Sequence, residues 1–344
     1  MNWLCCPACR NASFTLEKIK TVNRPIYASH YEDGEIDAAG IDPERGEEEE
    51  ILEGALHCNG CGAIYPIRSG IPRMMTEDAQ VGPDSGHRFT GFDTAVPEWE
   101  ENFRDFSMPL QPGDFLGKLV VDAGCGFGRH AFFAARYGAE VIAIDSSTDA
   151  VEAAERNTAN LNRVHVIQAD ISRLPVRERR CDIVYCYGVL HHVDDPESIL
   201  DSLTEAVRPG GALSLWVYGP RQGATRVANN ALRGVTTDLE PDQLMRLSKG
   251  IARTLRIFSH TPYVLFNKLP IIGPIVSHLP VHDHYRWPFD VVVADVYDRL
   301  RIPVKHWFTK EELEAWYSDN GFADVQVTRR VRNNETFRAL GVRR

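Results

Sequence analysis

From residue 118 onward, short apolar runs alternate with amphipathic segments. The apolar runs have the length and the Val and Ile content of buried strands, and we predict strands at 118–123, 140–145, 164–169, 181–187 and 211–218. The segments that follow them predict helices at 128–137, 148–161 and 196–207. Asp195 and Pro196 mark the start of the last of these, as an N-cap and a first-turn proline. Strands that alternate with helices predict an α/β fold with a parallel sheet covered on both faces.

The first predicted strand runs directly into a glycine-rich turn. Residues 120–128, Val-Val-Asp-Ala-Gly-Cys-Gly-Phe-Gly, place glycines at 124, 126 and 128 in front of a predicted helix. Such a turn lets a ligand lie against the backbone and the helix N-terminus. A dinucleotide fingerprint needs its third glycine at position 129, where this chain has Arg129. We therefore predict a nucleotide-binding loop that holds no pyrophosphate.

Three carboxylates stand at the ends of three successive predicted strands. They are Asp122, Asp145 and Asp170. Ligands of parallel sheets bind beyond the carboxyl ends of the strands. Asp145 lies 21 positions after Gly124, where a carboxylate takes the hydroxyl pair of a ribose. Asp170 is expected to accept a hydrogen bond from an adenine amino group. Together these residues predict an adenosine-containing ligand.

The segment from Asp122 to Gly128 resembles motif I of class I S-adenosylmethionine-dependent methyltransferases. Residues 181–196 and 207–213 are also similar to segments of that family, and the resemblance covers 118–220 and 306–344. It implies a doubly wound, Rossmann-like, seven-stranded and mostly parallel sheet whose last strand is antiparallel. The segments 323–331 and 335–342, joined by Asn333-Asn334, would form the final hairpin. The resemblance implies S-adenosyl-L-methionine as cofactor, bound by Asp122, Gly124, Cys125, Gly126, Gly128, Asp145, Ser146, Asp170, Ile171 and Tyr187.

Two histidines are candidates for the catalytic base. Methyl transfer from a sulfonium needs alignment and removal of a proton from the acceptor. His191 follows the strand 181–187 and is expected to face cofactor or substrate, although it could instead pack or cap the helix that starts at 195. In the methyltransferases that this chain resembles, a histidine shortly before the last helix faces the active site, which here implies His306. Thr309 to Glu312 forms the capping box that opens that helix.

The N-terminal part carries two Cys-x-x-Cys pairs, Cys6 with Cys9 and Cys58 with Cys61. Two such turns that face each other supply four thiolates for a tetrahedral, structural Zn²⁺ without an open coordination position. Between them, residues 31–53 hold eleven Asp or Glu against one Arg and are expected to form a solvated insertion. Residues 58–74 resemble the zinc-ribbon activator subunits of tRNA and rRNA methyltransferases. The resemblance covers 1 to about 75 and implies a ribbon that stabilises the fold or contacts a protein partner.

Composition narrows the choice of partners. The chain of 344 residues has a formal net charge of −10, which disfavours nucleic acid and anionic lipid unless a local basic patch exists. Six Arg between 329 and 344 form one such patch. We see no signal-peptide pattern and no transmembrane stretch. Eight cysteines with this spacing are therefore expected to belong to a reducing, cytoplasmic environment.

The predicted organisation has four parts. They are a zinc ribbon with an acidic insertion at 1–76, a linker or lid at 77–115, a methyltransferase core at 116–220 and 306–344, and a cap insertion at 221–305. In the linker, Phe89, Phe92 and Trp99 are expected to form a lid or simply to dock on the core. In the cap, the apolar run from Tyr263 to Val281 could line a pocket for a greasy substrate, lie at a membrane surface, or be structural.

We therefore predict methyl transfer to a small or lipophilic metabolite. The first alternative is an RNA methyltransferase that reads its substrate through the ribbon, which the net charge disfavours. The second is a cofactor-binding interaction protein without catalysis, because binding a cofactor does not require turnover.

Overall fold

The computed structural model describes residues 2–28, 31–32, 35–36, 40–41, 46–76, 79, 97–220, 236, 239–279, 281–301, 304–330 and 333–344. These residues fall into two compact units. The larger unit holds the described residues up to Pro220 and those from Lys305 onward, and the smaller unit holds those between them.

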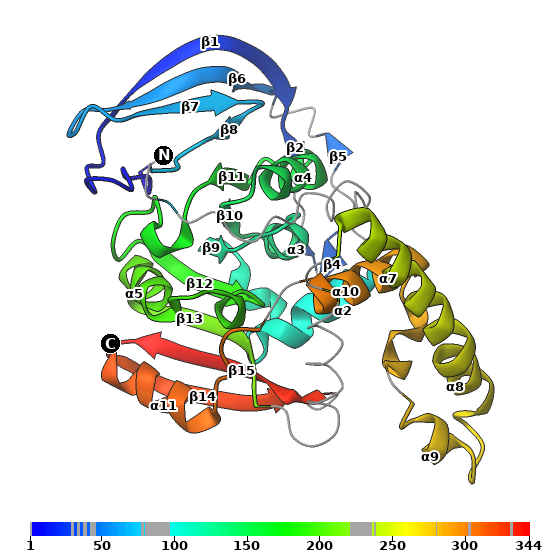
Figure 1. The fold of residues 1–344 in the computed structure, drawn as a ribbon. Coiled ribbons are helices and arrows are strands. Elements are labelled where there is room, and N and C mark those ends of the chain that lie inside the picture. The colour runs from blue at the N-terminus through cyan, green and yellow to red at the C-terminus, as the bar shows by residue number, and fades with distance from the viewer. Residues whose placement is uncertain are drawn as a thin grey trace. The chain divides into compact units, whose positions relative to one another are not determined.

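The larger unit is built on a seven-stranded sheet with the order β11-β10-β9-β12-β13-β15-β14 (Figure 1). Neighbouring strands from β11 to β13 are parallel, whereas β15 is antiparallel to both β13 and β14. The predicted fold class is thus confirmed. The strands are β9 Leu119–Ala123, β10 Glu140–Asp145, β11 Val164–Gln168, β12 Cys181–Tyr187, β13 Val207–Tyr218, β14 Phe322–Arg330 and β15 Asn333–Arg343.

Helices cover both faces of this sheet. On one face α2, α3 and α4 lie next to one another, and on the other lie α5 and α11 (Figure 1). Asp195 and Thr309 each accept a backbone N–H at the start of a helix, as predicted, and Ser147 does the same at the start of α4. The helices are α2 Pro97–Ser107, α3 Arg129–Arg136, α4 Thr148–Thr158, α5 Pro196–Ala206 and α11 Lys310–Asp319, with short turns η1 Pro112–Phe115, η2 Ile171–Arg173 and η3 Leu190–His192.

A second, antiparallel sheet precedes the first along the chain. It has the order β1-β6-β7-β8, with β1 Phe14–Pro25, β6 Glu47–Cys58, β7 Ile64–Arg68 and β8 Ile71–Pro72. Two-residue strands form separate ladders between β1 and β6, namely β2 Tyr27–Ala28 with β5 Gly40–Ile41 and β3 Tyr31–Glu32 with β4 Glu35–Ile36.

The acid-rich segment differs in part from the expected insertion. Its last residues, 47–53, continue β6 and pair with the outer half of β1. This is tolerated because cations on β1 face the acidic strand, where Lys18 pairs with Glu49 and Arg24 pairs with Glu50. The long-range pairing therefore turns a charged run into a largely exposed strand.

The N-terminal sheet covers the β11 edge of the large sheet. The backbone N–H of Met74 donates to the carbonyl of Gln168 over 2.7 Å, and the N–H of Cys5 donates to the carbonyl of Pro175 over 3.0 Å. The guanidinium of Arg10 donates to two further carbonyls of the segment after β11. Buried side chains of both sheets form one hydrophobic core that includes Trp3, Leu4, Leu56, Met74, Ile167, Leu174 and Val176. An open sheet edge is thus closed by the N-terminal ribbon.

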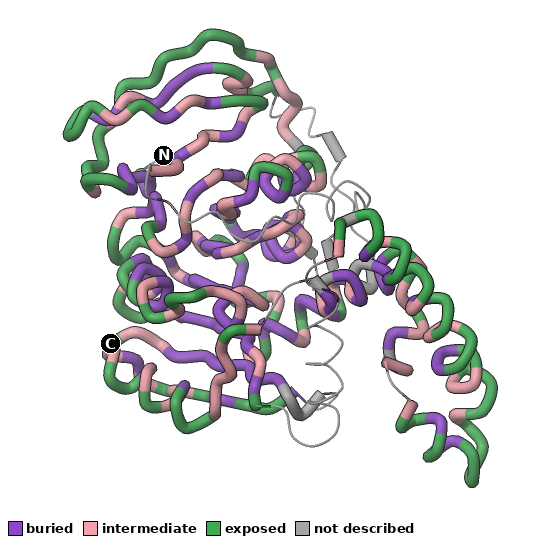
Figure 2. Tube along the Cα trace, viewed as in Figure 1, coloured by how far each residue is buried: buried purple, intermediate pink, exposed green. Residues whose placement is uncertain are grey.

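The smaller unit is helical. α7 packs against α10 through a buried cluster that includes Leu244, Ala252, Val292 and Val296. After α7 the chain continues through a π-helical turn into α8 and α9, whose residues are mostly exposed (Figure 2). No helix in the described part of the chain is long and apolar enough to span a bilayer. The elements are α7 Pro241–Leu255, η4 Arg256–His260, α8 Thr261–Phe266, α9 Gly273–Val276, η5 His282–Arg286 and α10 Phe289–Arg301.

Candidate functional site

The glycine loop folds back over the end of β10. The backbone N–H groups of Gly124 and Cys125 both donate to the carbonyl of Ile144, over 2.8 and 2.9 Å. Gly124 has φ +79°, and a Cβ there would lie 2.4 Å from Cγ2 of Val189. Gly128 has φ +81° and is the N-cap of α3. Only glycine satisfies both the left-handed backbone and the close approach at position 124.

Asp145 ties this loop to the strand end. Its Oδ2 accepts the backbone N–H of Gly126 over 3.0 Å, and its Oδ1 accepts the N–H of Ser147 over 2.9 Å. Each carboxylate oxygen has a second lone pair that can accept a further hydrogen bond. Asp145 therefore fixes the loop and is still able to bind ligand hydroxyls.

Asp122 lies on the neighbouring strand and is almost completely buried. Burial raises the pKa of this carboxyl to about 7, the Tyr185 hydroxyl on β12 opposes the rise, and the charge of Asp145 adds to it. Two adjacent carboxylates, one of which is poorly solvated, favour a positively charged ligand group beside them.

The third predicted carboxylate stands at the end of the next strand. Asp170 is the N-cap of η2, and its Oδ1 accepts the N–H of Ser172 over 2.8 Å. Ile171 beside it is buried. The carbonyl of Ser146 accepts a hydrogen bond from the Gln168 amide over 2.9 Å. The strand order β11-β10-β9 thus brings the carboxyl-end residues of three neighbouring strands to one edge.

Aromatic residues line the adjoining ends of β12 and β13. The Tyr187 hydroxyl lies 2.9 Å from Oγ of Ser214, and its ring stacks on Tyr185 with centroids 4.7 Å apart. Trp216 stacks on Phe106 of α2 with centroids 4.2 Å apart and an interplanar angle of 9°. Helix α2 therefore closes an aromatic cluster over these strands.

His130 completes this cluster and was missed from the sequence. It is buried in the first turn of α3, with its ring 5.6 Å from Phe106 and 5.5 Å from Tyr187. Burial, together with the charge of Arg129, holds its pKa well below the usual value, so the imidazole is neutral at pH 7. The sequence did carry a signal for the aromatic cluster. Aromatic residues recur at every second position in 185–187 and 216–218, so they share one face of the sheet.

A backbone hydrogen bond links the two predicted catalytic histidines. The carbonyl of His191 accepts the N–H of Lys305 over 2.8 Å and that of His306 over 3.3 Å. The His191 ring is fully buried and stacks on Tyr218 with centroids 3.8 Å apart. The His306 ring instead lies with Nε2 3.3 Å from the carbonyl of Asp194. The two rings therefore occupy different environments.

One of the three expected lid residues is described. Trp99 of α2 is buried against Phe127 of the glycine loop, with centroids 5.9 Å apart, and the Arg129 guanidinium lies 4.5 Å from the Trp99 ring centre. Phe89 and Phe92 lie outside the described residues. Helix α2 thus packs directly on the loop that follows β9.

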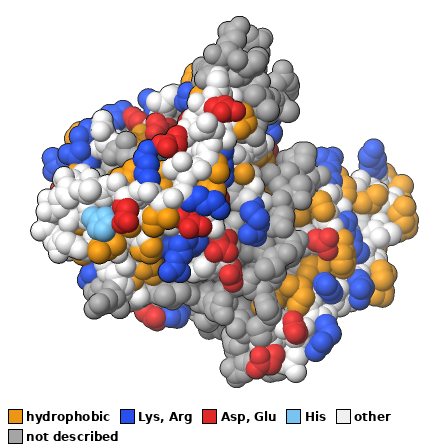
Figure 3. All heavy atoms as spheres, turned by 90° about the horizontal axis from the view of Figure 1, so that it is seen from above, with side chains coloured by type: hydrophobic (Ala, Val, Ile, Leu, Met, Phe, Trp, Pro, Cys, Tyr) orange, Lys and Arg blue, Asp and Glu red, His pale blue; other side chains and the backbone are white. Residues whose placement is uncertain are grey.

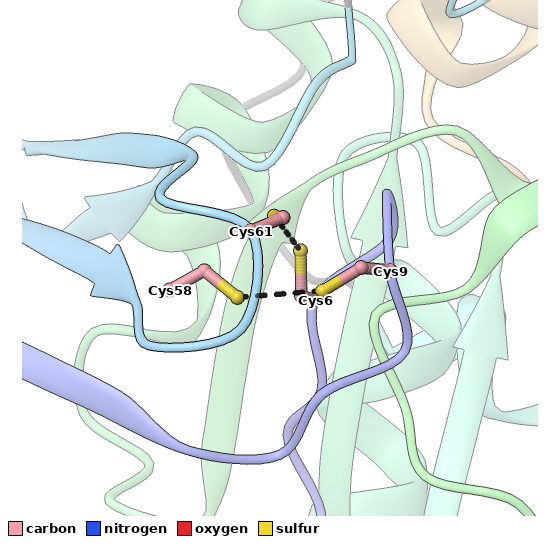
Figure 4. Close-up of side chains that lie close together, drawn as sticks. All are labelled: Cys6, Cys9, Cys58 and Cys61. Carbon is pink, nitrogen blue, oxygen red and sulfur yellow. Dashed lines mark hydrogen bonds between the residues drawn. The ribbon is translucent and has the colours of Figure 1, made fainter.

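The four predicted metal ligands converge in the N-terminal ribbon (Figure 4). Their sulfur atoms all lie within 4.8 Å of one another, with 3.7 Å between Cys6 and Cys61 and 3.5 Å between Cys9 and Cys58. A tetrahedral zinc with bonds of about 2.3 Å separates its sulfur ligands by about 3.8 Å. The Tyr65 hydroxyl lies 3.1 Å from the Cys6 sulfur and can donate to it. The donor set and its spacing fit a closed tetrahedral site.

The two regions match two different family models. Residues 121–215 match a methyltransferase domain, and residues 1–70 match a Trm112p-like protein. The chain is 40% identical over 107 residues to the mitochondrial ubiquinone biosynthesis O-methyltransferase of Schizosaccharomyces pombe, covering 29% of this chain and 38% of that protein. It is 34% identical over 160 residues to the ubiquinone biosynthesis O-methyltransferase of Cupriavidus pinatubonensis, covering 40% of this chain and 64% of that protein. The match thus spans less than two thirds of either curated relative.

Among solved structures, the chain is similar to a putative S-adenosylmethionine-dependent methyltransferase from Listeria monocytogenes. The identity is 20% and the TM-score is 0.42, over 72% of this chain and all of that one. The strand order, the glycine loop and both family matches agree with one another. Residues 121–215 therefore carry a methyltransferase domain, and residues 1–70 in front of it carry a Trm112p-like domain.

Proposed function

We propose that this protein is an S-adenosylmethionine-dependent methyltransferase that acts on a small or lipophilic metabolite. The observation that carries the proposal is the double hydrogen bond of Asp145, which joins the glycine loop to the end of β10. Asp145 would bind the ribose hydroxyls, Asp170 and Ile171 the adenine, and the loop backbone the amino-acid part. The cofactor supplies an electrophilic methyl group when bound.

The carboxylates fit this cofactor for an electrostatic reason. S-adenosylmethionine carries a sulfonium and an ammonium group, and the Asp145 carboxylate binds the loop, with the buried Asp122 carboxyl on the next strand. A ligand cation would compensate the poor solvation of the Asp122 carboxylate.

The acceptor is proposed to be an oxygen nucleophile on a small molecule. The curated relatives are named as O-methyltransferases, and the aromatic residues at the ends of β12 and β13 suit an apolar or ring-containing acceptor. His191 and His306 remain the candidate bases, and the buried neutral His130 joins them.

Three of the six C-terminal arginines that favour the RNA alternative make contacts within the protein. Arg330 and Arg338 are buried against Asp105 of α2, and Arg343 donates to the carbonyls of Thr204 and Val207. These arginines are engaged within the protein, so they do not present a basic face to a phosphate backbone.

We further propose that the four-cysteine site holds structural Zn²⁺. Four thiolates with tetrahedral spacing leave no position for water, which suits a structural role and not a catalytic one.

Calorimetric titration with S-adenosylmethionine tests the cofactor assignment. We expect binding by the wild type and a loss of about 100-fold or more in Asp145→Ala. Asp149→Ala, which removes an exposed carboxylate four positions further on, is the matched control and should bind normally. Transfer of radiolabelled methyl to a panel of phenols, quinols and tRNA then separates the acceptor classes. Absence of cofactor binding by the folded wild type would refute the assignment.

A further inference from the structure

The smaller unit exposes an unusual density of large apolar side chains. Between residues 257 and 275, nine such side chains are at least one third exposed, and Phe258, Ile271 and Ile275 reach 70%, 80% and 65%. They lie on η4, α8, α9 and the turn between the last two. The full set is Ile257, Phe258, Val264, Leu265, Phe266, Leu269, Ile271, Ile272 and Ile275, which we call the apolar tip. A contiguous patch of this kind marks an interaction surface.

The segment around the apolar tip carries a net charge opposite in sign to that of the whole chain. Residues 243–282 contain five Lys or Arg and no Asp or Glu, although the whole chain carries a formal −10. Arg246, Lys249 and Arg253 are exposed on α7, and Lys268 is exposed within the apolar tip. Figure 3 shows hydrophobic and basic side chains next to each other at the right of the view, with a few acidic side chains beside them. We call these four cations the basic collar, and leave out Arg256 because its guanidinium donates to the carbonyls of Tyr285 and Trp287.

We propose that the apolar tip inserts into the headgroup and acyl boundary of an anionic membrane, with the basic collar against the lipid phosphates. An apolar surface alone would fit a protein partner equally well. The charge decides between them, because a stretch with five Lys or Arg and no Asp or Glu complements an anionic lipid surface. Long Lys and Arg side chains can lay their stems along the apolar surface and keep the charged end at the headgroups.

The backbone of the apolar tip agrees with a shallow position. α8 has six residues and α9 four, and the connection between them contains Pro270. Apolar groups on short helices that lie in the interface bury their side chains without crossing the bilayer. The proposal goes beyond the methyl-transfer function and does not depend on which acceptor is used.

Flotation with lipid vesicles tests the proposal. The full chain is mixed with vesicles of phosphatidylcholine alone, or with about 30% phosphatidylglycerol, at about 0.1 M and about 0.5 M NaCl. We expect the protein to float with the phosphatidylglycerol vesicles at low salt and much less in the other conditions.

Two variants separate the apolar and the charged contributions. The triple variant Phe258→Ser, Ile271→Ser, Ile275→Ser should lose about tenfold or more of its partitioning. The triple variant Arg246→Gln, Lys249→Gln, Arg253→Gln should lose the preference for phosphatidylglycerol. The matched control is Ile19→Ser, Ile64→Ser, Leu116→Ser, which removes apolar side chains of 67%, 60% and 50% exposure from the larger unit and should float like the wild type.

Two results would overturn the proposal. One is a folded wild type that does not float with anionic vesicles, or that floats no better than its serine variant at the apolar tip. The other is a wild-type dimer that this variant converts to a monomer without any effect on vesicle binding, which would assign the apolar tip to a second copy of the chain. Titration of the same samples with S-adenosylmethionine tests the methyltransferase assignment independently. Either proposal can therefore fail while the other holds.

Discussion

The carboxylate of Asp145 accepts the backbone N–H of Gly126 over 3.0 Å. The bond crosses from the end of β10 to the loop after β9, so two neighbouring strands fix one loop. Because the same carboxylate also accepts the N–H of Ser147, its position is set from both sides. The glycine loop is therefore held in its shape by the protein alone, which lowers the ordering cost of ligand binding.

The first prediction concerns Gly124→Ala. A Cβ there meets two penalties, a φ of +79° and a contact of 2.4 Å with the Val189 side chain. We expect a loss of about 2–4 kcal/mol in the free energy of unfolding, measured by urea titration. Gly117→Ala is the matched control, because Gly117 has φ +68° but nothing within 4 Å of its added Cβ, and should cost only about 1 kcal/mol. Equal losses in the two variants would show that the contact with Val189 is unimportant.

The second prediction concerns pH. The Asp122 pKa is raised to about 7 in the folded protein, against about 3.9 in an unfolded chain. Between these values the folded state holds a proton that the unfolded state has released, so stability falls as the pH rises from about 4 to about 7. Asp122→Asn removes this dependence.

Thermal unfolding at several pH values measures the difference. We expect the Asn variant to be more stable than the wild type at pH 8, by on the order of 2–4 kcal/mol, and to gain little at pH 5. If the stability gain of Asp122→Asn over the wild type is as large at pH 5 as at pH 8, the raised pKa of Asp122 is contradicted. Because the variant and the wild type are compared at the same pH, the titration of all other groups contributes equally to both and cancels.

The core was predictable because its strands are continuous apolar runs. The predicted strands 140–145 and 181–187 coincide with β10 and β12. β13 begins at Val207, four residues earlier than predicted, because Val207 pairs with Cys181 although Pro209 and two glycines follow it. The predicted helix 196–207 and strand 211–218 left these residues outside the strand, and the pairing with β12 includes Val207 in it.

Other features depended on contacts between distant residues. The strand character of 47–53 needs the cations of β1, and the burial of Arg330 and Arg338 needs Asp105. The basic C-terminal segment therefore looked like a nucleic-acid patch, since the anion that pairs with Arg330 and Arg338 lies more than 200 positions away in the sequence. The same holds for His130, whose neighbours come from α2 and β12.

The third prediction links the metal to the methyltransferase sheet. The N-terminal ribbon covers the β11 edge and shares one core with the sheet. Cys58→Ser, or chelation, should therefore lower the unfolding temperature of the whole larger unit and not only that of the ribbon. Cys5→Ala changes a buried cysteine outside the four-sulfur cluster and is the control.

Elemental analysis and calorimetry check this prediction. We expect about one zinc per chain in the wild type and in Cys5→Ala, and none in Cys58→Ser. If Cys58→Ser loses the metal while the main unfolding transition stays at its original temperature, the ribbon and the sheet are energetically independent.

The fourth prediction concerns Asp105 of α2. Its carboxylate pairs with Arg330, and with Arg338 over 3.1 Å, and both arginine side chains are mostly buried. Removal of the shared anion leaves two cations that burial prevents from being well hydrated, and such a loss costs about 3–5 kcal/mol. We therefore expect Asp105→Ala to destabilise the protein strongly, as measured by urea unfolding. The triple change Asp105→Leu, Arg330→Met, Arg338→Met should recover most of the loss, because it leaves no buried charge. If Asp105→Ala instead leaves the free energy of unfolding nearly unchanged, the two arginines are hydrated or bind other acceptors. In that case the aromatic contacts alone hold α2 over the sheet.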